Sequence, residues 1–485
     1  MPDTTPANDA DRPDTPAVPR VANTRAIGTV GHGQIAQGLA DDAPIPKSRV
    51  RAWALWDWGS ASFNAVVTTF VFSTYLASSL FFDPEIVAER GEGAAEAASA
   101  SVVSGALTIA GVLVALLAPI LGQRSDGSGR RKLWLGVNTG LVIAAMLAMF
   151  FVAPVPSYIY LGAALLAVGN IFFEFAGVNY NAMLVQVSTP KTVGRVSGFG
   201  WGMGYVGGIV LLVILLVLFI QNFGSDTGNG VLNVPFGAEG GSLDIRFAIV
   251  VSALWFAIFA IPVLLKVPEI PARARENRVS FFGSYRQLFR TVAALAKKSP
   301  QVLLFLLASA VFRDGLAAVF TFGAIIAAQV FGFSPSEVIY FAVAANVSAG
   351  IGTFIGGWLD DRIGAKRVIL GGLLGLVLAG GSVIFIGDGK TGFWIAGLIL
   401  CLFVGPVQAA SRSFLARITP PGREGEIFGL YATTGRAVSF LAPGLFTLFV
   451  VLTEDTRYGI IGIVLVLLAG LLLMLPVKAR PSVIE

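Results

Sequence analysis

Long apolar stretches separated by short charged turns set the pattern of this chain from residue 52 onward. A bilayer core requires roughly 20 apolar residues per helix. No charged residue lies between Lys132 and Glu174, and the segment 153–157, which contains two prolines, divides this stretch into two spans. Extended to the whole chain, the pattern predicts about twelve membrane-spanning helices. They begin near Trp53, Ala98, Leu133, Tyr158, Arg195, Phe247, Val302, Glu337, Val368, Phe393, Ile427 and Tyr458.

The charge of the connecting segments alternates along the chain. Basic residues gather before residue 52, in the 122–132 turn and in the connector 267–300, whereas acidic residues gather between residues 83 and 96 and at Glu454 and Asp455. Because basic loops stay on the cytoplasmic side of a membrane, both termini and the connector are predicted to be cytoplasmic. The glycine-rich segment 221–244 then forms an exterior loop.

An even number of spans with a long central connector predicts two six-helix halves. Residues 1–50, rich in Pro, Asp, Thr and Ala without an apolar period, are predicted to be a disordered cytoplasmic tail. The remaining segments are an N-terminal half at 51–267, a connector at 268–300, a C-terminal half at 301–478 and a short tail at 479–485.

Composition excludes several classes of protein. Hydrophobic residues make up 55% of the chain and charged residues only 13%, against roughly 25% in a soluble domain. The net charge of +5 is explained by membrane topology, so we expect no nucleic-acid partner. The single cysteine, Cys401, and the single histidine, His32, exclude a disulfide and a cysteine-rich metal site. Without a nucleophile–base pair, a metal-ligand cluster or a phosphate loop, we expect no enzyme, no cofactor and no metal.

A charged turn occurs twice, at the same offset in each half. The first copy is GQRSDGSGRRK at 122–132 and the second is GWLDDRIGAKR at 357–367, so that Gly357 follows Gly122 by 357 − 122 = 235 residues. A carboxylate at a helix C-terminus needs a partner, which an arginine or the N-terminus of a neighbouring helix supplies. A simple positive-inside loop is the alternative, but the repeat favours a cytoplasmic gate. The gate candidates are Gly122, Asp126, Gly129, Arg130, Arg131, Gly357, Asp361, Arg362 and Gly364.

Both copies resemble the cytoplasmic signature of the major facilitator superfamily, and the first departs from it at Gly127, where the second has the usual Arg362. Within that superfamily, residues 50–478 resemble the unknown-major-facilitator family, the bacterial relatives of vacuolar amino-acid effluxers. The stretches that carry this resemblance are WALWDWGSASFNAVVTTFVF at 53–72, YNAML at 180–184, GRVSGFGWGMGYVGG at 194–208 and QAASRSFLARITPPGREGEIFGLYATTGRAVSFLAP at 408–443. The resemblance implies a twelve-helix, all-α bundle with pseudo-twofold halves and a secondary transporter that alternates access. It implies no particular substrate.

Ionisable groups at membrane depth are costly and are therefore candidates for a functional site. Counting residues places Glu174, Arg313, Asp314 and Arg436 near the middle of their spans. These four are either an interhelical salt-bridge set or the lining of a central cavity. In a cavity they would suit a zwitterion, with an arginine binding its carboxylate and an acid its ammonium group. Glu174 and Asp314 are the candidates for a proton-coupling group.

Polar side chains on other spans extend the predicted cavity. Asp57, flanked by tryptophans, is either an interface residue or part of the site, and Asn64 lies two turns deeper. Tyr180, Asn181 and Gln408, with Asn170 and Asn346, are either hydrogen-bonding groups of the cavity or links between helices. We expect Arg412 to form a cytoplasmic gate with Glu424 or Glu426.

The sequence thus predicts a secondary active transporter of a small polar solute, plausible substrates being an amino acid or a peptide-like molecule. Protons are the candidate coupling ion. The alternatives are a drug or lipid extruder of the same fold, and a non-transporting membrane receptor or scaffold. We expect a multi-pass monomer in the lipid bilayer of the cell membrane.

Overall fold

A computed structural model describes residues 45–82, 84–220, 231–232, 241–269, 281–385, 389–420 and 422–478, and these residues form helices and turns without a strand. The first group of helices comes from the N-terminal part of the chain. Its members are α2 (Lys47–Ala61), the π-helix η2 (Ser62–Val71), α3 (Phe72–Leu76), α4 (Pro84–Arg90), α5 (Glu92–Ser128), α6 (Arg131–Met149), α7 (Ile159–Ala182), α8 (Leu184–Val187), α9 (Val193–Leu215), η5 (Leu216–Ile220) and α10 (Leu243–Lys266).

The second group comes from the C-terminal part of the chain. It consists of α12 (Pro300–Gln329), α13 (Pro335–Ile363), α14 (Ala365–Ser382), α15 (Lys390–Ile418), α16 (Glu424–Val438), α17 (Leu441–Thr453) and α18 (Gly459–Met474). Between the groups, α11 (Phe281–Lys298) occupies part of the connector. Short 3-10 turns, η3 (Ser79–Phe81), η4 (Pro156–Tyr158) and η8 (Thr456–Tyr458), complete the elements.

The helix lengths agree with the predicted spans. Among the described residues, eleven helices are long and apolar enough to cross a membrane. The remaining predicted span, which begins near Trp53, is the segment Lys47–Leu76, divided into α2, η2 and α3. The eleventh span is also divided, into α16 and α17. The predicted all-α membrane bundle is therefore confirmed.

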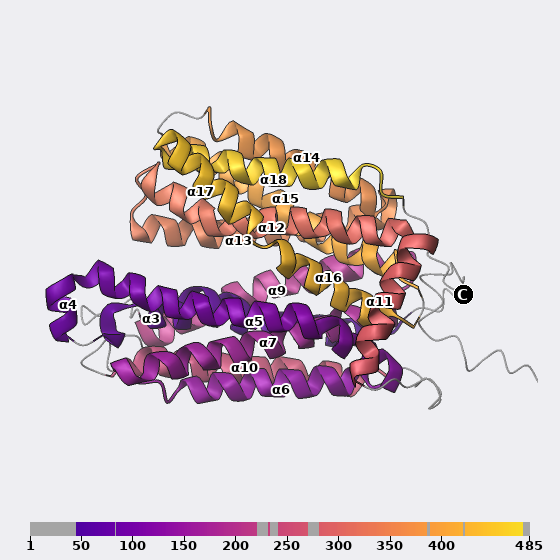
Figure 1. Cartoon of the computed structure of the whole chain (residues 1–485), viewed down its shortest axis with the longest axis horizontal. Helices are drawn as coiled ribbons and strands as arrows, with labels where there is room; N and C mark the ends of the chain where they lie inside the picture. The colour runs from indigo at the N-terminus through magenta and orange to yellow at the C-terminus, as the bar shows by residue number, and fades with distance from the viewer. Residues whose placement is uncertain are drawn as a thin grey trace, which may run out of the picture.

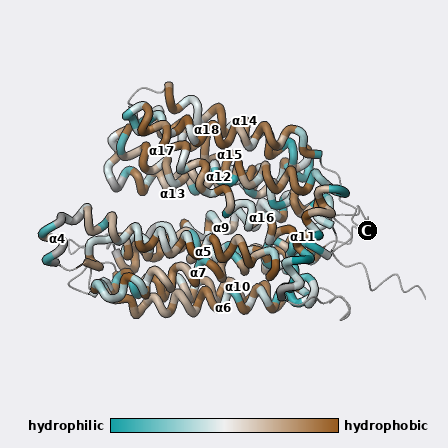
Figure 2. The backbone as a smooth tube through the Cα atoms, in the orientation of Figure 1, coloured by the Kyte–Doolittle hydropathy of each residue, from teal (hydrophilic) through white to brown (hydrophobic). Residues whose placement is uncertain are grey.

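The helices form two groups that lie side by side (Figure 1). The lower group in this view contains α5, α6, α7 and α10, and the upper group contains α12, α14, α17 and α18, while α11 runs across one end. Hydrophobic residues cover the lengths of the helices and hydrophilic residues gather near their ends (Figure 2). We call the end that carries the 122–132 and 357–367 turns and α11 the basic end.

Several predictions fall on residues outside those that the structure describes. They concern the tail up to residue 44 with His32, most of the exterior loop 221–244, residues 270–280 of the connector and the C-terminal residues 479–485. In the part of the connector that is described, the helix α11 was not predicted. Its last turn carries Lys297 and Lys298.

Candidate solute site and gates

Asp126 joins the two groups of helices at the basic end. Its Oδ1 accepts a hydrogen bond from the backbone N–H of Gly425 and its Oδ2 one from Glu426, each at 3.0 Å. Those N–H groups lie in the first turn of α16, where the unpaired donors and the helix dipole favour an anion. The predicted partner, the N-terminus of a neighbouring helix, is thus present, and it belongs to the opposite group.

Arg131, the first residue of α6, completes this contact. Its Nε donates to Asp126 Oδ1 at 2.8 Å, and its Nη2 donates to Glu424 Oε2 at 2.6 Å and also to Asp126 Oδ1. The guanidinium also donates to the carbonyl of Ala182. All three ionic side chains are almost completely buried, so each charge depends on its partners, of which Glu424 belongs to the other group. We call Asp126, Arg131, Glu424 and the N-terminus of α16 the first latch.

Asp361 forms the equivalent contact from the opposite group. Its Oδ1 accepts from the N–H of Gly194 at 2.7 Å and its Oδ2 accepts from that of Arg195 at 3.1 Å, at the N-terminus of α9. The Arg195 Nε lies 3.2 Å from the same carboxylate. Nearby, Arg417 pairs with Asp360, whose carboxylate also accepts from Ser413. We call Asp361, Arg195 and the N-terminus of α9 the second latch.

Four glycines allow the helices of each latch to meet. A Cβ on Gly122 would lie 2.0 Å from the carbonyl oxygen of Gly425, and a Cβ on Gly357 would lie 3.0 Å from the Cα of Gly198. Both pairs therefore require glycine for close approach. Gly129 and Gly364 have φ angles of 69° and 90° and reverse the chain at the ends of α5 and α13.

Two predicted gate residues, Arg130 and Arg362, take other positions. Arg130 is exposed at the start of α6. Arg362 lies over the ring of Trp358, 3.7 Å from its centroid, rather than against Asp361. The departure from the usual signature at Gly127 is therefore not matched by a weaker contact, because Arg131 supplies the guanidinium of the first latch.

The predicted partners of Arg412 are wrong. Glu424 is paired with Arg131, and Glu426 contributes its N–H to Asp126. Arg412 instead extends from α15 into the opposite group of helices. Its Nη1 donates to Asn181 Oδ1 at 3.1 Å and to Asp57 Oδ2 at 3.3 Å, and its Nε and Nη2 donate to Ser197.

Aromatic rings surround the same guanidinium. Its carbon lies 5.0 Å from the ring centroid of Trp53, 5.6 Å from that of Tyr180 and 5.5 Å from that of Trp201. Such distances are typical of cation–π contacts. We call Trp53, Asp57, Tyr180, Asn181, Ser197 and Trp201 the aromatic box. Three of the four stretches that carried the family resemblance contribute these residues, and the fourth contributes Arg412.

Another ion pair joins the two groups farther from the basic end. Arg436 of α16 pairs with Glu174 of α7, and its Nη2 donates to Asn170 Oδ1 at 3.3 Å. The two charged side chains are 33% and 29% exposed, although each points across the interface between the groups. Arg313 lies over the ring of Tyr431 at 3.8 Å and donates to its carbonyl oxygen at 3.0 Å. The sequence left two alternatives for these charges, a salt bridge between helices and the lining of a central cavity. The pairing of Glu174 with Arg436 is compatible with both.

Asp314 does not join this set. Its Oδ2 accepts from the N–H of Ala442 at 2.7 Å, in the first turn of α17. The helix begins again there because Pro443 cannot continue α16 through Ser439, whose carbonyl its ring would meet. Asp314 thus stabilises the break in the eleventh span from the neighbouring helix α12.

The remaining predicted polar residues lie around these contacts. Gln408, one turn before Arg412, accepts a hydrogen bond at 3.0 Å from Tyr205 of the opposite group. The side chain of Asn64 is exposed in the π-helix, and its carbonyl oxygen accepts from Thr68 and Thr69. Asn346 donates to the carbonyl of Ala342 within its own helix.

Sequence reasoning missed Ser197, Trp201 and the pairing of Glu424. Ser197 and Trp201 lie in the glycine series of α9 and share one face because they are four residues apart. That four-residue spacing is visible in the sequence. No sequence signal linked Glu424 with Arg131, which is 293 residues away.

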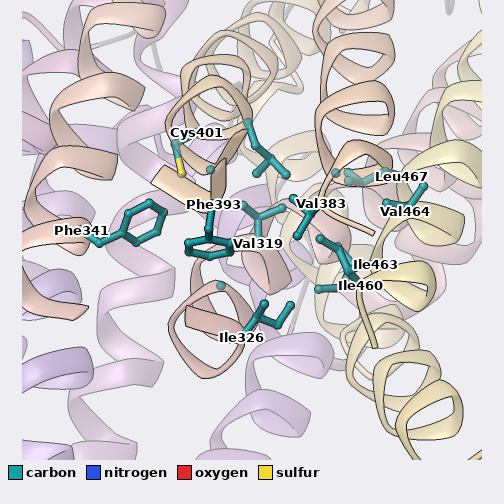
Figure 3. Close-up of a pocket in the computed structure, with 14 residues that line it drawn as sticks. Val319, Ile326, Phe341, Val383, Phe393, Cys401, Ile460, Ile463, Val464 and Leu467 are labelled. Carbon is teal, nitrogen blue, oxygen red and sulfur yellow. The ribbon is translucent and has the colours of Figure 1, made fainter. Parts of the chain in front are cut away.

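An apolar pocket lies inside the second group of helices (Figure 3). Val319, Phe341, Val383, Phe393 and Ile460 are among its lining residues, and none of the residues that line it is charged. The pocket is therefore apolar, unlike the contacts between the two groups of helices, which are polar and charged. Within the described residues, no group of His, Cys, Asp and Glu side chains is arranged to hold a metal ion.

Relatives of known sequence share most of this chain. A family model described as "Vacuole effluxer Atg22 like" matches residues 46–485. YxiO, an uncharacterized MFS-type transporter of Bacillus subtilis, is 26% identical over 89% of this chain and 95% of its own length. Autophagy-related protein 22-1 of Aspergillus fumigatus is 27% identical over 59% of this chain and 47% of its own. The chain spans about half the length of the fungal relatives it matches.

Solved structures share the fold at low identity. The proton:xylose symporter XylE has a TM-score of 0.66 at 12% identity, with 88% of this chain and 94% of that one covered. FucP, solved in an outward conformation, gives 0.63 at 14% identity, with 89% and 98% covered. The human organic anion transporter MFSD10 gives 0.66 at 15% identity, with 89% and 100% covered. The match along nearly the whole chain and the shared fold together show that this protein, a membrane transporter and not an enzyme, belongs to the vacuole effluxer Atg22-like family of the major facilitator superfamily.

Proposed function

We propose that the protein is a secondary active transporter that moves a small polar solute through a site containing Glu174 and Arg436. The observation that carries this proposal is their ion pair, which joins the two groups of helices and is about one-third exposed. An ion pair that only linked packed helices would be expected to be buried among them, whereas these two side chains remain 33% and 29% exposed. Partial exposure across an interface supports a polar centre that a solute can reach.

Both latches lie at the basic end, which we propose to be cytoplasmic on the positive-inside principle. The proposed arrangement is two halves at 51–267 and 301–478, with both chain termini in the cytoplasm of a cell-membrane monomer. The structure then represents the form closed to the cytoplasm, an assignment that the outward conformation of the fold relative FucP supports. Breaking both latches while the far ends approach would give the opposite form, which is alternating access.

The chemistry of the central pair supports a solute with both charges. Arg436 suits a carboxylate and Glu174 an ammonium group, so binding would exchange one ion pair for two. An amino acid or a short peptide has this pattern. The family's description as vacuole effluxers and the autophagy-related names of the fungal relatives agree with such a solute.

Proton coupling is assigned to Glu174 rather than Asp314. Asp314 accepts the backbone N–H of Ala442, so its protonation would remove a helix cap. When a solute carboxylate takes over Arg436, the carboxylate of Glu174 is released, and the solute's ammonium group and a proton then compete for it. Glu174→Gln should therefore abolish the dependence of transport on the pH gradient while exchange of solute continues. Coupling that survives in E174Q would remove Glu174 from this role.

Thermal stabilisation by a panel of amino acids, dipeptides, sugars and nucleosides tests the solute class. A ligand that binds the folded protein raises its melting temperature in proportion to the logarithm of its concentration. We expect an amino acid or a dipeptide to stabilise the wild type and to lose this effect in Arg436→Gln. The control is Glu337→Gln, which removes an exposed ion pair with Lys390 at the N-terminus of α13 and keeps the capping box with Ser334. A response that persists in Arg436→Gln would contradict the proposed site.

A further inference from the structure

The aromatic box is assembled entirely from one group of helices. Trp53 and Asp57 come from α2, Tyr180 and Asn181 from α7, and Ser197 and Trp201 from α9. Its occupant, the guanidinium of Arg412, comes from α15 of the other group. If the two halves separate at the basic end, as the proposed function requires, Arg412 leaves and all six side chains of the box remain together.

Contacts within the box hold its shape without Arg412. The Trp53 indole donates to the carbonyl oxygen of Tyr180 at 3.1 Å, and the two rings stack at 4.5 Å with an interplanar angle of 6°. Trp56 stacks on the other side of Tyr180 at 4.4 Å and is itself held by a 3.0 Å bond to Thr139. The Tyr180 hydroxyl donates to Asp57 Oδ2 at 2.8 Å. The rings and the carboxylate are thus preorganised for a cation.

Departure of Arg412 would leave Asp57 without its cationic partner. The Asp57 side chain is 15% exposed, and among the described charged side chains its ion pair is with Arg412. A carboxylate so placed favours replacement of the lost cation. Flat aromatic faces beside a carboxylate are the arrangement that recognises organic cations.

We propose that the aromatic box is a second binding site, separate from the central pair, which the cationic group of the transported solute, a guanidinium or a primary ammonium, occupies on its way to the basic end, and that Arg412 is the tethered occupant of this site in the form closed at the basic end. This inference rests on the proposed function, since it requires the halves to part. Tyr180 follows Glu174 by six residues, or about 9 Å along α7. The box therefore lies roughly two helical turns from the central pair, on the way to the basic end. Closing returns Arg412 to the box and displaces the solute.

The test replaces the tethered cation with a free one. In purified full-length Arg412→Ala, guanidinium chloride at about 10 mM should raise the melting temperature by about 2 °C over equal sodium chloride. It should also change tryptophan fluorescence saturably, with a dissociation constant at least tenfold lower than in the wild type. Urea, which has the shape of guanidinium without its charge, should do neither. Arg412→Gln, which keeps most of the side-chain volume, provides the same test if Arg412→Ala folds poorly.

Two control variants separate the box from simpler explanations. Arg362→Ala also uncovers a tryptophan, Trp358, at the basic end, but no carboxylate is paired with Arg362 among the described contacts. It should give no saturable response. Adding Asp57→Asn to Arg412→Ala should remove the response that the single variant gained.

The inference is wrong if guanidinium and sodium chloride act alike on both Arg412 variants, or if the response survives Asp57→Asn. It is also wrong if acidification alone stabilises Arg412→Ala to the same extent, because the box would then take a proton instead. These outcomes leave the central site untouched. Failure of the proposed function would appear separately, as a solute response that is unchanged in Arg436→Gln.

Discussion

Asp126→Asn should open the basic end of the protein. The carboxylate of Asp126 accepts two backbone N–H groups of α16 at 3.0 Å and the Nε of Arg131 at 2.8 Å. The side-chain amide of asparagine has a single acceptor oxygen, so at least one of these hydrogen bonds is lost. The remaining hydrogen bonds are no longer made to a charged acceptor. A hydrogen bond to a charged group contributes about 1.5–3 kcal/mol. A charge at a helix N-terminus contributes about 0.3–1 kcal/mol more.

These contributions predict a loss of about 3 kcal/mol from the closed form, because Arg131 keeps Glu424 as a partner. Each 1.4 kcal/mol is tenfold in an equilibrium constant, so the closed form should lose roughly 100-fold in population relative to the open form. Asp361→Asn should have a smaller effect. The partner side chain in that latch, Arg195, is 63% exposed, and water competes for its contact.

Spin labels at Arg130→Cys and Arg367→Cys report the change. Both residues are exposed, and they lie at the starts of α6 and α14, in different groups of helices. Changing Cys401 to Ser removes the chain's single native cysteine. Double electron–electron resonance should show a longer interlabel distance in Asp126→Asn than in the parent.

Asp455→Asn is the matched control. Asp455 also accepts a backbone N–H, from Arg457 at 2.8 Å, but it lies away from both latches at the start of η8. The interlabel distance distribution of Asp455→Asn should equal that of the parent, the doubly labelled protein that carries only the changes at residues 130, 367 and 401. A distribution that is also unchanged in Asp126→Asn would show that the first latch does not hold the basic end closed.

Two further predictions follow from the same geometry. Gly122→Ala should also lengthen the interlabel distance, because its Cβ would lie 2.0 Å from the Gly425 carbonyl oxygen, whereas Gly127→Ala, whose Cβ meets nothing within 4 Å, should leave it unchanged. Asp314→Asn should weaken the cap of α17 and lower the free energy of unfolding by about 1 kcal/mol, seen as a lower melting temperature with the solute's KM unaffected.

The sequence predicted most of the bundle because lipid imposes strict requirements on helix length and loop charge. It did not predict where helices break. Pro443 lies near the break in the eleventh span. The apolar residues continue on both sides of it, so the hydropathy pattern predicts one uninterrupted helix. The amphipathic helix α11 was not predicted, because the cations of the connector were interpreted only as evidence for its cytoplasmic position.

The latches were partly predictable because each Asp lies at a helix end, where a dipole partner is expected. The identity of each partner depended on packing between segments that are 299 residues apart in the first latch and 167 residues apart in the second. Arg412 shows the limit most clearly. Glu424 and Glu426 were assigned to it because they are near in sequence, whereas Asp57, its actual partner, is 355 residues away.

Solute counterflow in proteoliposomes tests most directly the claim that Glu174 and Arg436 form the transport site. Liposomes loaded with an amino acid, a dipeptide or a neutral sugar would exchange it for external labelled solute. The proposal predicts exchange of an amino acid or a dipeptide by the wild type and by the exposed-site control Arg367→Gln, and its loss in Arg436→Gln. Exchange that persists in Arg436→Gln, or a wild type that exchanges the neutral sugar alone, would contradict the account.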